Sequence, residues 1–331
     1  MEDLKLILPN AVILPDINPG TLTFGSLDPY PAKEIFPNSD CSAFLPAFET
    51  QANTYFDTYA CVSHSFENAV ETLIKATLSR DEWLLENIYR NGGPDFSDRD
   101  LAILSGTIPG IGNSGEKVLH TAQTRGLIPQ TAGDWDTSSR DTKMVQALYY
   151  AYSRTKDGEI LAKSFNERYK ITGIWVHKNN WEEAMKEGTL QVYVKAWSKN
   201  SEGKYYNPTP GFYNHAVVAV SYKDISILDT YQPAIKQLTS WDDAHIWALK
   251  INITKIMPIK VKMENNTLVQ LVEGVGGFGL YLDDKIFVDD LSKILASWLV
   301  RNNGKLDGKT RALTLSDWNA FSKVNLKGET V

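Results

Sequence analysis

Cysteine is scarce in this sequence, and only Cys41 and Cys61 occur among its 331 residues. Two cysteines exclude a disulfide-rich framework and a zinc site built from cysteine alone. A chain of this length forms one large domain or two, and it can bury a core that needs no cross-links. Hydrophobic residues make up 43% of the chain and charged residues 22%, which excludes a disordered protein.

Long apolar runs are missing as well. No stretch of 18 or more apolar residues occurs, so we predict no membrane span. The N-terminus carries Glu2, Asp3 and Pro9, which do not fit the basic and apolar regions of a secretory signal. We therefore predict no signal peptide and a cytoplasmic protein. The formal net charge of −6 argues against a general nucleic-acid surface, so no nucleic-acid partner is expected.

The order of hydrophobic patterns along the chain predicts an α+β fold, because helices come first and antiparallel-type strands second. We expect the helices at 61–78, 81–90, 115–125 and 141–168, and the strands at 190–197, 214–222, 225–230 and 246–253. The proline-rich residues 1–45 are expected to form an N-terminal arm. Residues 258–331 are expected to form a small accessory domain with strands at 267–273 and 278–288 and a helix at 289–300.

Cys61 begins the clearest of these predicted helices, just after Asp57 and Thr58, which could cap its start or complement the charge of its dipole. A helix N-terminus stabilises a thiolate and so makes a cysteine nucleophilic. The competing interpretation is a small buried hydrophobic residue, which is the common role of a lone cysteine. Cys41 lies in a polar loop without helical support, and we interpret it as an ordinary loop residue.

A cysteine nucleophile needs a base, and His215 is the best candidate because it opens an apolar predicted strand that would hold it rigidly. Asp229 follows the next predicted strand and could accept the second imidazole N–H. The competing interpretations are a sheet-edge histidine and an aspartate that caps a turn. The remaining histidines are interpreted as packing or surface residues, namely His64, His120, His177 and His245.

This ordered set resembles the papain-like cysteine peptidases, in which a cysteine begins a long helix and a histidine and an asparagine follow on distant strands. The matching segments are Cys61–Phe66, Phe96–Leu101, Asn113–Gly115, Asn214–Val220 and Asp229–Tyr231. The resemblance covers about residues 45–255. It implies a papain-like catalytic domain at 46–257, with an N-terminal helical subdomain and a C-terminal antiparallel β subdomain.

The resemblance implies a Cys61–His215–Asp229 triad, with aspartate in place of the family's asparagine. It also implies that Gln51 contributes to the oxyanion hole, although the family's glutamine position, six residues before the nucleophile, is Tyr55 here. The family's loop that binds the substrate main chain corresponds to three consecutive residues, Asn113, Ser114 and Gly115. The family's second cysteine near the nucleophile is absent from this chain.

The function implied by the resemblance is hydrolysis of peptide bonds in a peptide or protein substrate, through an acyl-enzyme and without a metal or organic cofactor. The chain also resembles bacteriophage-encoded proteins of this class, which would make it virion-associated. One alternative is a catalytically silent papain-fold subunit of a larger assembly, with the arm and the C-terminal domain as assembly contacts. Another is an acyltransferase or amidase, since these share the acyl-enzyme step.

Two glycine patterns suggest a third alternative, a nucleotide-binding site. Gly110–Gly115 and Gly274–Gly279 both match the dinucleotide-binding spacing. Such a site also needs a strand directly before the motif and a helix directly after it. The first motif lacks a convincing parallel βαβ unit, and the second leads into a predicted strand, so we do not favour this alternative.

Overall fold

The computed structural model describes residues 34–51, 56–130, 142–262, 268–274, 277–282 and 285–287. The chain divides into two compact units, Met1–Ile253 and Thr254–Val331, and each is described by itself. The first unit contains helices and an antiparallel sheet, as the sequence predicts. All predicted site residues lie in it.

The α-helices of the first unit are α1 Cys61–Thr77, α2 Glu82–Asn87, α3 Asp98–Leu104, α4 Gly115–Arg125, α5 Thr142–Tyr150, α6 Lys156–Arg168 and α7 Trp181–Glu187. Short 3-10 helices lie at Pro37–Ser39, Ser42–Phe44, Lys178–Asn180 and Trp241–Asp243. The predictions at 61–78 and 115–125 are confirmed. The predicted helix at 81–90 is shorter in the structure, and the one at 141–168 is two helices. The helices α3 and α7 were not predicted.

The main sheet has the strand order β3-β10-β4-β7-β8-β9. Its strands are β3 Tyr169–His177, β4 Thr189–Val194, β7 His215–Ser221, β8 Ser226–Leu228, β9 Ile235–Gln237 and β10 Trp247–Lys255. Neighbours from β10 through β9 pair in antiparallel fashion. The four predicted strands are therefore confirmed, whereas β3 and β9 were not predicted. Two small sheets pair β1 Tyr89–Arg90 with β2 Gly93–Pro94, and β5 Ser198–Lys199 with β6 Tyr205–Tyr206.

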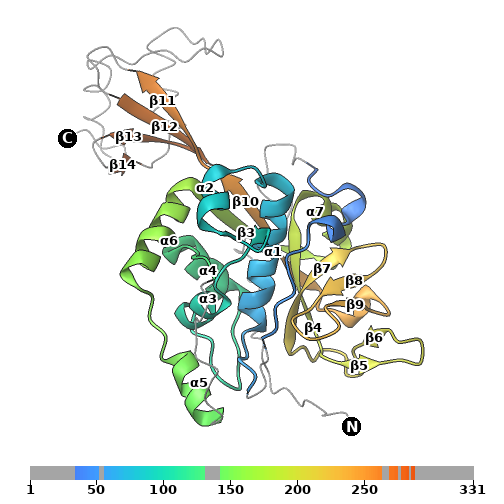
Figure 1. Cartoon of the computed structure of the whole chain (residues 1–331). Coiled ribbons are helices and arrows are strands. Elements are labelled where there is room, and N and C mark those ends of the chain that lie inside the picture. Colours follow the sequence, from blue (N-terminus) through green and yellow to red (C-terminus); the bar gives the residue numbers. More distant parts are fainter. Residues whose placement is uncertain are drawn as a thin grey trace, which may run out of the picture. The chain divides into compact units, whose positions relative to one another are not determined.

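Helix α1 lies at the centre of the first unit. In Figure 1 it runs between the helices α3, α4 and α6 on one side and the strands β7 and β8 on the other. Every residue from Cys61 to Ile74 is buried. Its apolar side chains Phe66, Val70 and Leu73 share one core cluster with Val218 of β7. An amphipathic helix normally buries one face, so burial all round indicates that α1 is a core helix.

The opposite face of the sheet is covered as well. Along β7, Ala216 and Val218 belong to the cluster around α1, whereas Val217 and Ala219 belong to a second cluster with Trp181 of α7. This alternation follows the two-residue period of a strand. A sheet buried on both faces needs apolar residues at consecutive positions, which explains the continuous apolar run from Ala216 to Val220 in β7.

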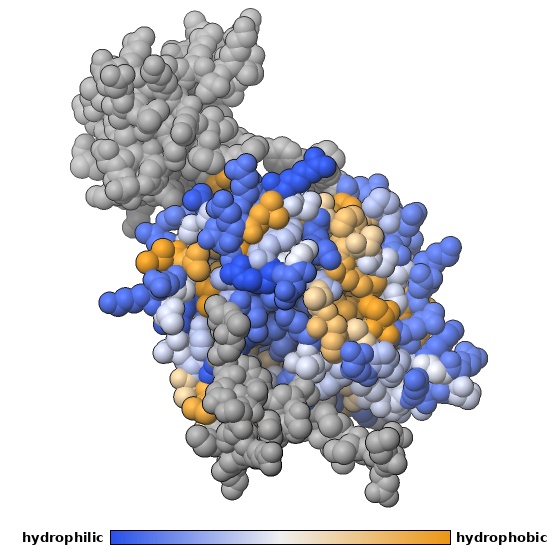
Figure 2. All heavy atoms as spheres, viewed as in Figure 1, coloured by the Kyte–Doolittle hydropathy of each residue, from blue (hydrophilic) through white to orange (hydrophobic). Residues whose placement is uncertain are grey.

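The surface of the first unit is mixed. Figure 2 shows a face that is largely hydrophilic, with hydrophobic side chains gathered to the right of centre, over the area that Figure 1 gives to β7 and β8. Ile160 on α6 is also an exposed apolar residue. Scattered exposed apolar side chains of this kind are normal for a folded protein.

The second unit contains a four-stranded antiparallel sheet of β11 Met257–Lys262, β12 Leu268–Gly274, β13 Gly277–Leu282 and β14 Lys285–Phe287, in that order. The predicted strands at 267–273 and 278–288 correspond to β12, β13 and β14. The predicted helix at 289–300 and most of the predicted N-terminal arm lie outside the described residues. The proposed domain boundaries stay predictions.

Candidate functional site

Cys61 is the first residue of α1, as predicted, and it is fully buried. The chain enters the helix through Tyr59, whose φ of 55° is unusual for a residue with a side chain. Ala60 occupies the N-cap and offers no side-chain hydrogen bond. The predicted capping by Asp57 and Thr58 is therefore wrong, because Asp57 instead accepts a hydrogen bond from the Tyr59 N–H at 2.7 Å. The uncapped first turn leaves the positive end of the helix dipole at the thiol.

His215 and Asp229, fourteen residues apart in sequence, are direct partners. The distance between His215 Nε2 and Asp229 Oδ1 is 2.6 Å, and both side chains are fully buried. His215 begins β7, and Asp229 directly follows β8, which pairs with β7. The hairpin between these strands therefore brings the two residues together, as the sequence analysis anticipated.

Cys61 approaches His215 from α1. The carboxylate of Asp229 contacts Nε2 of His215. Among the described residues, the fully buried Nδ1 of His215 has no hydrogen-bond partner apart from the Cys61 thiol. Burial alone would lower the pKa of His215, but Asp229 and then Cys61 outweigh it and raise the pKa to about 10. The arrangement therefore favours an imidazolium between a carboxylate and a sulfur that can become a thiolate.

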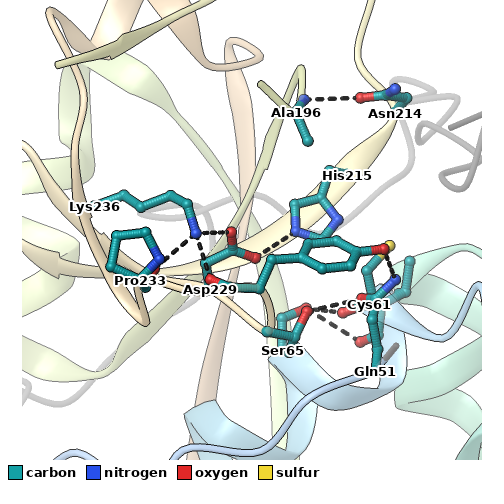
Figure 3. A network of polar contacts seen from close by, with 12 residues as sticks. Gln51, Cys61, Ser65, Ala196, Asn214, His215, Asp229, Pro233 and Lys236 are labelled. Atoms are coloured by element: carbon teal, nitrogen blue, oxygen red, sulfur yellow. Dashed lines mark hydrogen bonds and ion pairs between the residues drawn. The ribbon is translucent and has the colours of Figure 1, made fainter. Parts of the chain in front are cut away.

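Lys236 is a buried member of this network that the sequence analysis missed. Its Nζ donates to Asp229 Oδ2 at 2.5 Å and to the backbone carbonyl oxygens of Tyr231 and Pro233. Figure 3 shows Lys236, Asp229 and His215 in a row, with Cys61 beyond His215. Lys236 lies in β9, an edge strand of the sheet, where a lysine is ordinarily read as a solvent-facing residue.

The charges in this row shift each other's pKa. Burial would raise the pKa of Asp229, but His215 and then Lys236 outweigh it and hold this pKa below its usual value. Burial lowers the pKa of Lys236, and the Asp229 charge opposes that effect only in part. Asp229 therefore carries a stable negative charge that two buried cationic groups share.

Aromatic rings enclose His215. The Trp197 ring meets it edge-on, with centroids 5.4 Å apart, and the Tyr231 ring lies at 5.2 Å with a 39° tilt. Trp197 also faces Lys236, whose Nζ is 5.1 Å from its centroid. Such packing fixes the imidazole plane and excludes water from the pair with Asp229. Cys61 and His215 are both 0% exposed, so side chains must move before a substrate can reach the sulfur.

Gln51, the predicted oxyanion residue, lies beside this network but is fully engaged. Its Nε2 donates to Asp57 Oδ1 at 3.1 Å and to the Tyr231 hydroxyl at 2.6 Å, and its Oε1 accepts from Thr230 at 2.8 Å. Tyr231 in turn donates to Asp57. An oxyanion contact by Gln51 would require one of these amide hydrogen bonds to open, so this role stays a prediction.

The predicted substrate loop Asn113–Gly115 forms the start of α4. Asn113 donates to Ser105 and Thr107 at 2.7 and 3.2 Å, and the Ser114 hydroxyl accepts from the Lys117 N–H at 3.4 Å as a helix N-cap. All three residues of the loop are buried. These contacts account for the polar side chains of the loop structurally, and its binding of substrate stays a prediction.

Gln191 of β4 is a second residue that the sequence analysis missed. It is fully buried, and its Nε2 donates to the Val62 carbonyl at 2.8 Å and to the Ser65 hydroxyl at 2.7 Å. The Ser65 hydroxyl donates to the Cys61 carbonyl at 2.6 Å. Gln191 therefore ties the first turn of α1 to the sheet that carries His215. A buried glutamine within an apolar strand is the signal that could have revealed it.

The other residues considered above have different roles. The Cys41 thiol donates to the Ala219 carbonyl at 3.6 Å, and burial followed by the charge of Asp40 raises its pKa to about 12. Cys41 and Cys61 are both buried, and they do not form a disulfide with each other. The glycine motif at Gly110–Gly115 follows helix α3, not a strand, so it lacks the βαβ context of a dinucleotide site. Across the described residues, we find no helix with the length and hydrophobicity to cross a bilayer.

Comparisons with known proteins complete the description. No family model matches the sequence, and no curated protein matches it. Among solved structures, the chain is similar to the crystal structure of xylellain, a cysteine protease from Xylella fastidiosa. That similarity covers 73% of this chain and 96% of that chain, with 12% sequence identity and a TM-score of 0.49. The expected bacteriophage origin and virion association find no support in these comparisons.

Proposed function

We propose that this protein is a cysteine peptidase-like hydrolase that cleaves peptide bonds through an acyl-enzyme on Cys61. The observation that carries the proposal is the hydrogen bond between His215 Nε2 and Asp229, which leaves Nδ1 for the thiol at the start of α1. A nucleophile, a base and a group that orients the base are the parts that such chemistry requires.

In the proposed mechanism, His215 Nδ1 takes the proton of the Cys61 thiol, and the thiolate attacks the scissile carbonyl carbon. The backbone N–H groups at the start of α1 stabilise the negative oxygen of the tetrahedral intermediate. The imidazolium then protonates the leaving amine, and a thioester remains on Cys61. Water, deprotonated by His215, hydrolyses the thioester and regenerates the thiol. Asp229 holds the ring in place and stabilises its positive charge.

A second candidate, a catalytically silent binding subunit on the same scaffold, is favoured by one specific observation. Cys61 and His215 are inaccessible, and both amide hydrogens of Gln51 are engaged. An active hydrolase must open this site transiently, whereas a silent subunit need not. In that case the N-terminal arm and the C-terminal domain would supply assembly contacts. Hydrolytic activity and thiol reactivity distinguish the two candidates.

The test is incubation of the protein with a mixed peptide library, with cleavage products identified by mass spectrometry. We expect Cys61→Ala to lower the cleavage rate by several orders of magnitude, because no other group replaces the nucleophile. Cys41→Ala is the matched control, since it removes the other buried thiol, and it should retain cleavage. Iodoacetamide should label Cys61 in preference to Cys41. Full activity of Cys61→Ala would refute the proposal.

A further inference from the structure

A second cluster of titratable side chains lies on another face of α1. His64 and Glu67 project from the helix, Asp98 is the first residue of α3, and Glu49 comes from the segment before α1. One ligand atom each from Glu49, His64 and Asp98 lies within 4.8 Å of the other two. His64 Nδ1 and Asp98 Oδ1 are 3.0 Å apart. Three separate segments therefore converge on one point beside the catalytic helix.

Within this cluster, oxygen acceptors face one another. Glu67 is 2% exposed, its Oε2 accepts no hydrogen bond, and its carboxyl group lies against that of Asp98. Glu71 is different, because its Oε1 accepts from the Phe96 N–H at 2.7 Å. The side chains of Glu49 and Glu67 both form hydrogen bonds with Asp98, so protons join these carboxyl groups. A metal cation between these oxygens would take the place of those protons.

Two cationic side chains near the cluster contact backbone carbonyl groups. Lys75, one turn after Glu71 on α1, donates its ammonium to a backbone carbonyl of the segment before the helix. Arg99, next to Asp98, directs its guanidinium to the backbone carbonyls of Leu148 and Tyr149. Asp98 contacts the imidazole of His64.

The mixture of ligand types narrows the choice of ion. Calcium and magnesium prefer oxygen ligands alone, whereas an imidazole nitrogen with carboxylate oxygens suits zinc. Two zinc ligands at 2.0–2.1 Å in tetrahedral geometry stand roughly 3.3 Å apart, close to the 3.0 Å between His64 Nδ1 and Asp98 Oδ1. We propose that Glu49, His64, Glu67 and Asp98 bind one zinc ion, which joins the segment before the nucleophile to α1 and α3.

This site is independent of the Cys61 chemistry. The ligands are contributed by α1, by α3 and by the segment that holds Glu49, so bound zinc would restrain these three parts against each other. The expected effect is structural, because an ion that binds only the folded state stabilises it by mass action. The sequence analysis found no metal motif because the four ligands have no regular spacing along the chain.

The experiment is isothermal titration of zinc chloride into the full chain after treatment with a chelator. We expect one zinc ion per chain and a rise in the melting temperature. Glu49→Gln should weaken zinc binding by at least about 100-fold. Removal of a residue that only hydrogen-bonds to a metal ligand already lowers metal affinity by about 10–100-fold. Glu49 is half-buried and lies outside the helices, so this variant should fold. His64→Asn should have the same effect on binding.

Two controls separate this site from others. Asp242→Asn removes an exposed carboxylate far along the chain and should leave zinc binding unchanged. Cys61→Ala tests whether zinc binds the catalytic pair instead, and it should also leave the stoichiometry unchanged. Absence of zinc binding, loss of binding in Cys61→Ala, or unchanged binding in both Glu49→Gln and His64→Asn would each overturn the proposal.

Discussion

Replacement of Asp229 by asparagine tests the electrostatics of the candidate site most directly. The amide keeps the shape of the carboxylate but removes the charge that His215 and Lys236 share. Breaking a buried ion pair by removal of one partner costs about 3–5 kcal/mol. The lower end is expected here, because Lys236 keeps two backbone carbonyl partners. We therefore expect a loss of about 3 kcal/mol in the free energy of unfolding near pH 6.

The pH dependence of this loss gives the sharper test. Asp229 and Cys61 raise the pKa of His215 from its ordinary value of 6.5 to about 10, so its charge stabilises the folded state fully below pH 6.5. That contribution is lost as the pH rises through about 10. An opposite charge typically shifts a pKa by 1–3 units, so the pKa of His215 should fall by roughly that amount in Asp229→Asn. The difference in stability between the two proteins should therefore shrink from pH 6 to pH 10.

The assay is urea unfolding at pH 6, 8 and 10, with the m-value checked for a change in the denatured state. A double-mutant cycle with Lys236→Met isolates the coupling between Lys236 and Asp229. In that cycle, the second substitution should cost less in the Asp229→Asn background, where the ammonium has already lost its charged partner. A destabilisation below about 1 kcal/mol at pH 6, or one independent of pH, would refute this account of the site.

Two further predictions concern the scaffold and are measured by urea unfolding. Gly126 ends α4 with a φ of 68°, and an added Cβ would overlap a backbone carbonyl of α6. Gly126→Ala should therefore lose more stability than Gly203→Ala, where φ is 85° and the added Cβ would meet only the Lys199 side chain at 3.7 Å. Equal losses would contradict the packing argument. Arg154→Met leaves the buried Asp100 carboxylate without its ion-pair partner and should cost about 3–5 kcal/mol. Arg125→Met is the control, because it removes one partner of a half-exposed ion pair and should cost under about 1 kcal/mol. A cost as large as that of Arg154→Met would contradict the argument that burial sets the cost.

The sequence predicted the elements that have long and regular patterns. The helix from Cys61 was found because its apolar residues recur at helical spacing, and β7 because its residues form one apolar run. The pairing of His215 with Asp229 followed from these elements, since a short hairpin connects the strands that carry them. The structure thus shows the expected contact between His215 and Asp229, whereas the catalytic roles of these residues stay predictions.

The parts that the sequence did not predict depend on long-range contacts. Helix α3 has only seven residues, too few for a periodic pattern to be distinctive. Lys236 stands in a three-residue edge strand, and nothing local indicates that its ammonium is buried against Asp229. Gln191 meets the first turn of α1 across 129 residues of sequence. Capping by Asp57 was predicted from residue type alone, and the tight turn through Tyr59 gave that carboxylate other donors.

The burial of α1 on all sides has a consequence for how the first unit unfolds. The helical layer and the sheet both pack on this helix, so departure of either layer would expose the same apolar surface to water. The two layers are therefore expected to unfold in a single cooperative step. The amide hydrogens of α1 should exchange with deuterium only at the rate of global opening, while exposed loops exchange much sooner. A chain that keeps this helix keeps the whole thiol site, and partly unfolded forms with a reactive Cys61 should not accumulate.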